Sequence, residues 1–577
     1  MRICLVTPFA WPQPHDVNEH VAGAADGLRR RGHDVTVIAP STRSTDLQAG
    51  RRALQRGELP EVLAIGQALP VSRTSALAVP VGVRANLRHA LAVGRFDVVH
   101  GFEAGLPSLS YAALLEAECL TAATFVAPER LGSLRKAARD RLRARVDVLL
   151  ATSSAAALAA EAEFASDVQL VPAGVDTDLF RPANKQDLLA LQLESAARPL
   201  LRAALRALDE LPDWSAICLH TKPLGVRPAV PARLRGRVAV RSTRRPHERA
   251  ELLGAANVFV PLPGGHTRLW LEAAAAGCAI VDPPGSDGQP ELVTAAIARL
   301  GENPAHLADE AGRAREAAER ESFARLAEQL DTAYRDLARK PRRRENERRP
   351  AEARPRILVD LHMHTSASHD CSIEPAELVE HALAIGLGAI AVTDHNVFSG
   401  ALETVAAARA TDLVVIPGEE MKTDAQGEVI GLFLRDEIPG GLTFADTIAA
   451  IREQEGIVYL PHPFDRRHAI PAPATVHRHL AEIDVLEVYN ARLLKEAYND
   501  EALRFARKYG LLQGAGSDAH VLPGVGTGVL RMAPFDGPEE FLLALRTAEV
   551  LRRPKSLAYL QSLKWVAQAR DRLTTPS

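Results

Sequence analysis

Short apolar runs alternate with longer stretches of helical periodicity along most of the chain. Near the start, the run ICLVTP is followed by the amphipathic stretch VNEHVAGAADGLRRRGH and then by the apolar run DVTVIAP. This order predicts a strand, a helix and a second strand. Later runs such as FDVVHGF, VDVLLATS and NVFVPLP repeat the alternation, which predicts parallel sheets with helices on both faces.

Changes in this pattern predict the domain boundaries. The phrase VPAGVDTDLFRP closes a first domain, residues 1–182, and a second domain follows at 183–338, ending in a helical stretch rich in Ala, Glu and Arg. Residues 339–356 carry many charges and almost no apolar side chain, which predicts a solvated linker. Strands and helices resume in a last domain, 357–577.

The composition of the chain argues against a nucleic-acid-binding protein and against a membrane protein. The chain has 577 residues, 47% of them hydrophobic and 24% charged, with a net charge of −3. Such a balance predicts no stable nucleic-acid binding and no anionic membrane partner, and no apolar run is long enough for a membrane span. The five cysteines are scattered and form no CxxC pair, which is typical of a reducing cytoplasm.

In the last domain, each of six predicted strands ends in side chains that can bind metal. The carboxyl ends of strands in a β/α barrel meet at one mouth, so we expect these side chains to converge. Residues i and i+2 of a strand share a face, so the first two histidines should lie side by side. The residues at these ends are His362, His364, Asp394, His395, Glu419, Glu420, His462, Asn490, Asp518 and His520.

Imidazole and carboxylate together are ligands for Zn, Mn, Fe or Mg. Two such ions a few Å apart can share a hydroxide and clamp a phosphoryl group. A single histidine at a strand end is more often an ordinary hydrogen-bonding residue, but six successive strand ends favour a metal centre.

The phrases DLHMHT, TDH, PGEE, PHP and SDAH resemble the motifs of the polymerase and histidinol phosphatase (PHP) superfamily, over residues 357 to about 560. The resemblance implies a distorted seven-stranded (β/α)7 barrel with two or three divalent ions. The implied metal ligands are His362, His364, Asp370, His395, Glu420, His462, Asn490, Asp518 and His520. All of these except Asp370, His395 and Asn490 are also expected to be catalytic.

At two positions of this ligand set, the sequence does not decide which side chain binds a metal. Many members of the superfamily have histidine where this chain has Asn490, and an asparagine binds cations only through its carbonyl oxygen. The third metal therefore depends on a weaker ligand. Near the first motif, either His369 or Asp370 could turn inward.

The resemblance implies hydrolysis of a phosphomonoester or phosphodiester by a hydroxide that bridges two metals. By analogy with small phosphoesterases, the substrate is a phosphorylated small molecule, a nucleotide or a short oligonucleotide. Basic side chains that follow the strand ends are candidates to hold its phosphates, although each is also an ordinary surface charge. These candidates are Lys422, Arg466, Arg467, Arg492 and Lys495.

The first 335 residues resemble retaining glycosyltransferases of the two-Rossmann GT-B type, through phrases such as VVHGFEAGLPSLS and LWLEAAAAGCAIVDPP. The resemblance implies a nucleotide-sugar site between the two domains. Glu272 fits the second of two glutamates of the family, but Gly264 stands in place of the first. The loop PQPHDV lacks the usual glycine pair, and no Arg and Lys match the diphosphate clamp. We therefore expect a degenerate module. Glu272 is its candidate nucleotide-sugar-binding residue, and the alternative is that His20, Glu103 and Glu272 are only helix-surface or capping residues.

The predicted fold class is α/β, with two Rossmann-like domains of GT-B type followed by a distorted PHP barrel. The favoured function is a metal-dependent phosphoesterase fused to an inactive glycosyltransferase-like module. One alternative is an active glycosyltransferase whose barrel is an accessory hydrolase. A third is a module that binds a nucleotide sugar and regulates the barrel.

Overall fold

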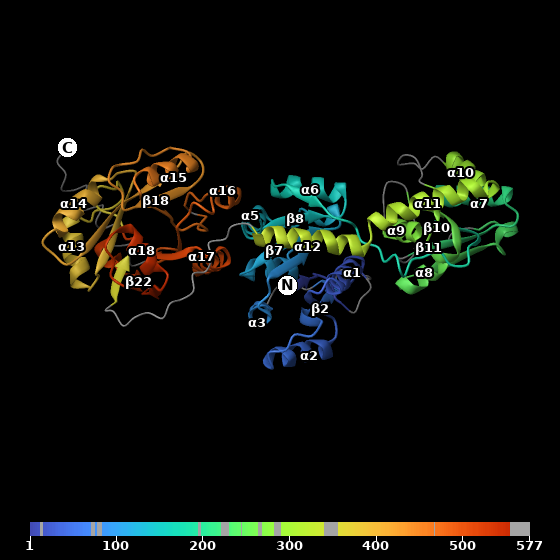
Figure 1. Cartoon of the computed structure of the whole chain (residues 1–577), viewed down its shortest axis with the longest axis horizontal. Coiled ribbons are helices and arrows are strands. Elements are labelled where there is room, and N and C mark those ends of the chain that lie inside the picture. The colour runs from blue at the N-terminus through green and yellow to red at the C-terminus, as the bar shows by residue number, and fades with distance from the viewer. Residues whose placement is uncertain are drawn as a thin grey trace. The chain divides into compact units, whose positions relative to one another are not determined.

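A computed structural model describes residues 1–11, 15–70, 76–77, 83–193, 198–220, 230–243, 245–262, 268–281, 290–339, 356–466 and 468–553. The chain forms two compact units, Met1–Arg339 and Lys340–Ser577 (Figure 1). Most of the predicted linker and Arg467 lie outside the described residues. Among the described helices, none is both long and apolar enough to cross a membrane.

Two parallel sheets form the first unit. The first has the order β3-β2-β1-β6-β7-β8-β9. Its strands are β1 (Arg2–Val6), β2 (Asp34–Ser41), β3 (Val62–Gln67), β6 (Val98–Phe102), β7 (Leu120–Phe125), β8 (Val148–Ala151) and β9 (Val168–Leu170). Its helices are α1 (Asp16–Arg30), α2 (Ser44–Gln55), α3 (Arg84–Gly94), α4 (Leu109–Glu116), α5 (Lys136–Arg145) and α6 (Ser154–Phe164), and β4 (Leu69–Pro70) and β5 (Ala76–Leu77) make a small hairpin.

The second sheet has the order β12-β11-β10-β13-β14, which again starts at a central strand and extends outward in both directions. Its strands are β10 (Gln186–Gln192), β11 (Ser215–His220), β12 (Val238–Ser242), β13 (Ala256–Val260) and β14 (Ala279–Ile280). The helices that follow are α7 (Arg198–Glu210), α8 (Pro246–Ala255), α9 (Arg268–Ala275), α10 (Pro290–Glu302), α11 (Pro304–Arg320) and α12 (Phe323–Arg339). Two Rossmann-like domains are therefore present, as predicted.

The last helix of this unit, α12, packs on the first sheet rather than the second (Figure 1). Its apolar side chains Phe323, Leu326, Leu330 and Tyr334 are buried with the strands and helix α1 of the first domain. The predicted boundary at residue 338 placed this helix with the second domain, and only its packing reveals its true neighbours.

The second unit contains one mixed sheet, in the order β21-β20-β19-β18-β17-β16-β15-β22-β23. Its strands are β15 (Ile357–Asp360), β16 (Ala389–His395), β17 (Val414–Lys422), β18 (Glu428–Leu432), β19 (Ile457–Leu460), β20 (Val485–Asn490), β21 (Leu512–Gly516), β22 (Gly528–Met532) and β23 (Glu549–Arg552). Its helices are α13 (Pro375–Ala384), α14 (Ser399–Ala408), α15 (Phe444–Glu453), α16 (Pro473–Arg478), α17 (Glu496–Tyr509) and α18 (Gly537–Leu545).

This sheet is nearly closed, because the segment after β15 meets the end of β21. Leu361 N donates to Ala515 O at 3.2 Å, and Met363 forms a parallel bridge with Ala519. Strand β18 runs antiparallel to both β17 and β19. The count of seven strands is not confirmed, since the described sheet has nine, but the convergence of its strand ends follows from this closure.

Candidate metal centre

The histidines of the DLHMHT motif stand just past a strand, and the far end of the sheet holds them in place. Strand β15 ends at Asp360, two residues before His362. Asp518 N donates to His362 O at 2.7 Å, and His364 N donates to Ala519 O at 3.1 Å. Both imidazoles are fully buried. Backbone pairing thus brings the first and last motifs together.

Four predicted ligands form a first group. His362 Nε2 and His364 Nε2 lie 3.4 and 3.6 Å from Glu420 Oε2. The same two atoms lie 3.9 and 3.4 Å from Asp518 Oδ1. Two imidazoles and two carboxylates from three segments therefore face one small space.

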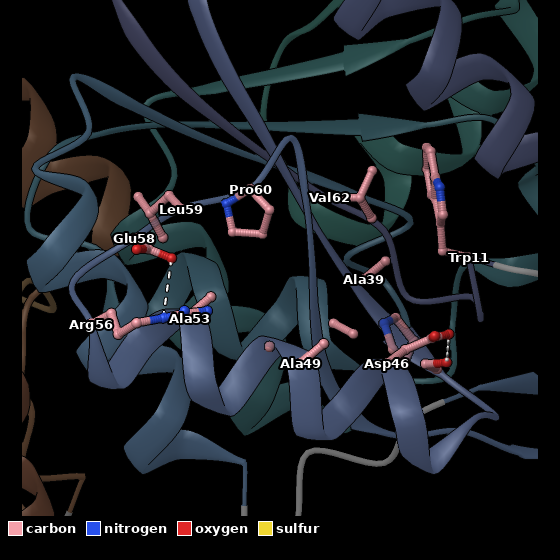
Figure 2. Close-up of a pocket in the computed structure, with 14 residues that line it drawn as sticks. Trp11, Ala39, Asp46, Ala49, Ala53, Arg56, Glu58, Leu59, Pro60 and Val62 are labelled. Atoms are coloured by element: carbon pink, nitrogen blue, oxygen red, sulfur yellow. Dashed lines mark hydrogen bonds and ion pairs between the residues drawn. The ribbon is translucent and has the colours of Figure 1, made fainter.

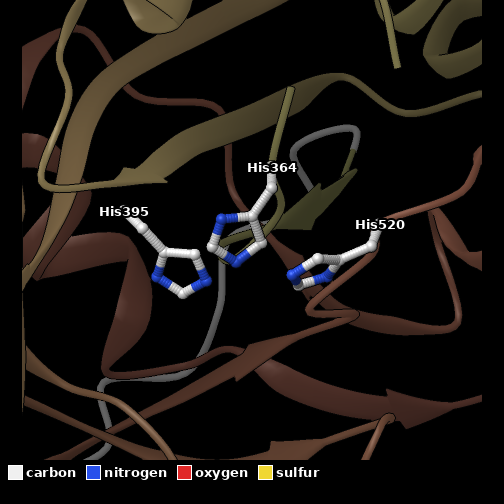
Figure 3. Close-up of side chains that lie close together, drawn as sticks. All are labelled: His364, His395 and His520. Carbon is white, nitrogen blue, oxygen red and sulfur yellow. The ribbon is translucent and has the colours of Figure 1, made fainter. Parts of the chain in front are cut away.

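A second group surrounds three imidazoles, with His364 between His395 and His520 (Figure 3). Asp370 belongs to it, because its carboxylate lies 3.0 Å from His520 Nε2 and 3.8 Å from His395 Nε2. His369 stands farther out, with its ring 6.0 Å from that of His395. The structure thus turns the aspartate inward and leaves the histidine beside the group.

A third group joins Glu420, His462 and a residue that the sequence reasoning missed, Glu428. His462 Nε2 lies 3.1 Å from Glu420 Oε1 and 3.8 Å from Glu428 Oε2. Burial, together with the neighbouring carboxylate of Glu420, raises the pKa of Glu428 to about 7. Glu420 therefore contributes to all three groups, since His395 Nδ1 is also 3.1 Å from its Oε2.

The pKa values of His362 and His364 are shifted in opposite directions, because the two buried imidazoles have different charged neighbours. Burial opposes the charged form of His362, but Glu487, Glu420 and Asp518 raise its pKa well above the ordinary value. His364 is the opposite case, because burial and the neighbouring His520 lower its pKa well below the ordinary value. A neutral imidazole is the form that binds a metal.

Glu487 supports the centre from behind and was not predicted. Its Oε1 lies 3.1 Å from His362 Nδ1 and accepts a hydrogen bond from Tyr459 Oη at 3.0 Å. Its Oε2 accepts from His462 N at 2.8 Å and from Asn490 Nδ2 at 3.0 Å. Carboxylates in this position orient metal-binding histidines. An acid in the middle of the apolar run DVLEVYN was the available signal.

Two other acids at the strand ends have structural partners instead. Asp394 accepts hydrogen bonds from Thr365 N at 2.7 Å and Ser368 Oγ at 2.6 Å, and so fixes the loop after the first motif. Glu419 accepts from Ile438 N at 2.9 Å. The alternation of side chains along a strand explains why Glu420 faces the centre while its neighbour Glu419 does not.

The side chain of Asn490 lies beside the predicted metal ligands and makes hydrogen bonds there. Its Nδ2 donates to Glu487 Oε2 at 3.0 Å and to Asp518 Oδ2 at 3.3 Å. Its Oδ1 accepts from Arg492 N at 2.9 Å. The carbonyl oxygen, which is the atom that could bind a cation, is therefore engaged with the backbone.

The basic candidates differ in their position. Arg492 Nη1 donates to Asp518 Oδ1 at 3.1 Å and lies 3.0 Å from His520 Nδ1, so it stands at the edge of the metal groups. Lys422 is exposed at the end of β17, and Arg466 is half-buried after His462. Arg467 lies outside the described residues. Arg492 therefore contacts two of the predicted metal ligands, Asp518 and His520.

In the first unit, an ion-pair network surrounds Glu272. Arg249 donates to both carboxylate oxygens of Glu272, at 2.6 and 2.7 Å, and to Glu19 Oε2 at 2.8 Å. Arg268 lies 2.9 Å from Glu19 and 3.2 Å from Glu272. Glu272 and Arg249 are both buried. These four residues, from helices α1, α8 and α9, form the Glu272 network.

Two further residues of this unit are buried rather than surface groups. His20 lies with Nδ1 at 2.7 Å from Ala173 O, and burial lowers its pKa to about 4. Glu103 accepts hydrogen bonds from Val126 N and Ala127 N at 2.9 and 3.0 Å, and burial raises its pKa to about 7. Both act as structural hydrogen-bonding residues.

A pocket of about 610 Å³ lies beside helix α2 in the same unit (Figure 2). Trp11, Leu59 and Val62 supply part of its apolar lining, and Asp46 is one of the few charged side chains there. The residues that line it come from β2, α2, β3, the segment between α2 and β3, and the loop after β1, and they include none of the predicted site residues.

The predicted metal ligands fit divalent cations on the chemistry of their atoms. Each group combines imidazole nitrogen with carboxylate oxygen, which is a donor set of Zn, Mn or Fe sites. His364 Nε2 is buried and has no hydrogen-bond partner among the described residues. This nitrogen lies 3.6 Å from Glu420 Oε2 and 3.4 Å from Asp518 Oδ1, so it could bind a cation together with these carboxylates.

Comparison with known families assigns the two units separately. Residues 17–179 match the model described as Glycosyltransferase Family 4. Residues 360–501 match the model of the PHP domain, and residues 496–550 match that described as PHP-associated. The three matches follow the order of the units.

Individual relatives each match only part of this chain. An uncharacterized protein of Methanocaldococcus jannaschii is 35% identical over 215 residues, which is 35% of this chain and 85% of that protein. Phosphatidyl-myo-inositol mannosyltransferase of Propionibacterium freudenreichii is 35% identical over 164 residues, or 27% of this chain and 42% of the relative, so the chain spans less than half of that enzyme. A solved candidate metal-dependent phosphoesterase of Bifidobacterium adolescentis is 18% identical, with a TM-score of 0.25, over 30% of this chain and 90% of that one.

Proposed function

Because the C-terminal part of this chain belongs to the PHP-domain family and the N-terminal part is glycosyltransferase-like, we propose that the protein is a metal-dependent phosphoesterase. The reaction is the hydrolysis of a phosphomonoester or a phosphodiester. The observation that supports this most directly is that Glu420 lies within 3.1–3.4 Å of histidines in three groups of imidazole and carboxylate donors, which come from separate segments of the chain.

Two or three divalent ions, when bound, would activate water and neutralise charge on the phosphoryl group. His362, His364, Glu420 and Asp518 would hold one ion, and Asp370, His395 and His520 would hold another. The chain itself keeps these side chains in place through Glu487 and through the backbone bonds between the first and last motifs. The side chains of His362, His364, Glu420, Asp518 and His520 are buried, whereas those of His395 and Asp370 are 25% and 23% exposed.

Arg492 would orient the substrate. Its guanidinium stands beside Asp518 and His520, and its side chain is 30% exposed, so it can reach both the centre and an incoming ligand. A guanidinium offers parallel donors to a phosphate, which lysine does not. Nucleotides and short oligonucleotides are the first substrates to test.

The experiment uses the full-length protein and variants of two ligands from different motifs. Purified wild type should contain divalent metal and hydrolyse p-nitrophenyl phosphate or its bis ester in the presence of Mn²⁺. His362→Ala and Asp518→Ala should lose both metal and activity while keeping their circular dichroism. Unchanged metal content in both variants would refute the proposed centre.

The glycosyltransferase-like unit is proposed to lack transferase activity. The supporting observation is that Arg249 and Arg268 already engage the carboxylate of Glu272, the residue that matches the glutamate of active enzymes. A nucleotide sugar would have to compete with a buried ion pair for this group. Calorimetry with UDP-, GDP- and ADP-sugars should detect no binding, and sugar turnover with any of them would overturn this part of the proposal.

A further inference from the structure

We propose that Glu428 completes a separate cation site with Glu420 and His462, in place of an imidazole at position 490. The inference rests on the proposed metal-dependent function and assigns a ligand that the family motifs in this sequence do not mark. It concerns the third of the donor groups described above.

The hairpin β17–β18 places Glu428 beside Glu420. In the antiparallel register, Glu420 is opposite Ile430 and Lys422 is opposite Glu428. Residues opposite each other, and their diagonal neighbours two positions along, share one face of the sheet. Glu428 is therefore a diagonal neighbour of Glu420, and both side chains extend toward His462.

The spacing of the donor atoms suits a cation. The ligand atoms of Glu420, Glu428 and His462 all lie within 4.8 Å of one another, with His462 Nε2 at 3.1 Å and 3.8 Å from the two carboxylates. Donors about 2.0–2.2 Å from a shared ion lie roughly 3–3.5 Å apart in tetrahedral or octahedral geometry. Small side-chain adjustments would bring all three atoms to one ion.

The burial of Glu428 is a second, independent observation that favours a cation at this position. Glu428 Oε2 is buried and has no hydrogen-bond partner among the described residues. The His462 side chain is 2% exposed and that of Glu428 is 14% exposed, so both groups have little access to water. A buried carboxylate oxygen without a donor is costly, and a second carboxylate close by increases that cost. A cation between Glu420 and Glu428 would satisfy both.

The side chain of Asn490 does not face the proposed cation site of Glu420, Glu428 and His462. Its carbonyl oxygen accepts from Arg492 N, and its amide nitrogen faces Glu487 and Asp518 rather than Glu428. A carboxylate is also a stronger ligand than an amide carbonyl for divalent ions, because it carries charge. The loss of an imidazole at 490 and the presence of Glu428 are therefore complementary features of this chain.

The test measures metal stoichiometry in the full-length protein. Wild type, Glu428→Gln, Glu428→His and the exposed control Glu403→Gln are stripped with a chelator, reloaded with Mn²⁺ and analysed by mass spectrometry and calorimetric titration. Glu428→Gln should bind one Mn²⁺ fewer per chain, or bind one class of ions at least about tenfold more weakly. Glu428→His keeps a donor atom and should retain that ion, as should the control.

The outcomes separate this inference from the proposed function. Wild type that binds no Mn²⁺ would refute the metal-dependent function itself. Wild type that binds Mn²⁺, with both the stoichiometry and the affinities unchanged in Glu428→Gln, would refute the role of Glu428 alone. Loss of every ion in Glu428→Gln, with circular dichroism preserved, would also overturn the assignment, because it would show that Glu428 does not serve one separate site.

Discussion

Glu487 Oε1 lies 3.1 Å from His362 Nδ1, at the side of the imidazole that faces away from the donor atoms of Glu420 and Asp518. The same carboxylate group receives the backbone N–H of His462 at 2.8 Å. One buried acid therefore fixes two histidines that belong to different donor groups. This makes Glu487 a positioning residue rather than a metal ligand.

Removing the charge of Glu487 should weaken metal binding without unfolding the chain. We expect Glu487→Gln to lower the affinity for Mn²⁺ about 10- to 100-fold, since partners of this kind set the orientation of metal-binding imidazoles. Competition with a chelating dye measures the affinity directly. The exposed Glu453→Gln is the matched control, and an affinity equal to that of this control would contradict the positioning role.

Arg492 should contribute to substrate binding. A hydrogen bond to a charged group is worth about 1.5–3 kcal/mol, so Arg492→Ala should raise KM about 10- to 100-fold. Arg492→Lys should be intermediate, because it keeps the charge but loses the paired donors. Metal content is measured in parallel, and a loss of metal at unchanged KM would show instead that Arg492 only supports Asp518.

The Glu272 network should make Arg249 important for the stability of the first unit. Arg249→Ala leaves Glu272 buried without its main partner, and we expect the free energy of unfolding to fall by about 3–5 kcal/mol. The double variant Arg249→Met with Glu272→Leu should lose less, because no unpaired charge remains. Urea unfolding can be followed by tryptophan fluorescence, since three of the four tryptophans, Trp11, Trp214 and Trp270, belong to this unit.

The control for this prediction is Arg313→Ala, which removes an exposed ion pair with Glu310 on helix α11. Such pairs contribute at most about 1 kcal/mol. If Arg249→Ala costs no more than this surface variant, the network does not stabilise the fold as described.

The first unit should become less stable in mild acid because of His100. Its Nδ1 lies 2.6 Å from Tyr334 Oη and its Nε2 lies 2.7 Å from Thr124 Oγ1, and burial followed by the nearby His20 lowers its pKa to about 3. Between that pH and the ordinary value of 6.5, only the unfolded chain binds the proton. Stability is therefore complete above pH 6.5 and falls as the pH decreases, by up to about 1.4 kcal/mol per pH unit.

The measurement compares wild type with His100→Gln in urea between pH 7.5 and 5. The variant should be less stable than wild type at pH 7.5, and the difference should shrink toward pH 5, by about 2 kcal/mol if His100 is the only group that changes. A difference that stays constant over this range would mean that His100 is not kept neutral by the fold.

Most residues of the proposed metal centre could be brought together from the sequence because a parallel strand delivers its last residues to one edge of the sheet. His395 and Glu420 were found in this way, as were the histidines after β15. Glu428 was missed because β18 runs antiparallel, so this residue stands at the beginning of its strand instead of the end. Glu487 was missed for a related reason, since it lies inside β20 and reaches the centre from behind.

Helix α12 shows that the sequence can predict a helix without predicting which sheet it packs on. Its periodicity predicts a helix with one apolar face, and Phe323, Leu330 and Tyr334 lie on that face. The pattern does not say which of two similar sheets will cover it. Only the three-dimensional packing against α1 and the first sheet decides this, because both sheets offer apolar surfaces of the same kind.

The closure of the second sheet affects how this protein must be synthesised. His364 and His520 lie about 160 residues apart in the sequence, yet their rings are 4.3 Å apart because backbone bonds join the two ends of the sheet. At a synthesis rate of about 5–20 residues per second, the first histidine leaves the ribosome roughly 8–30 s before the last. A chain whose translation stops early would thus contain the first histidine without the last one. The proposed metal centre can therefore assemble only after the second unit has been translated in full.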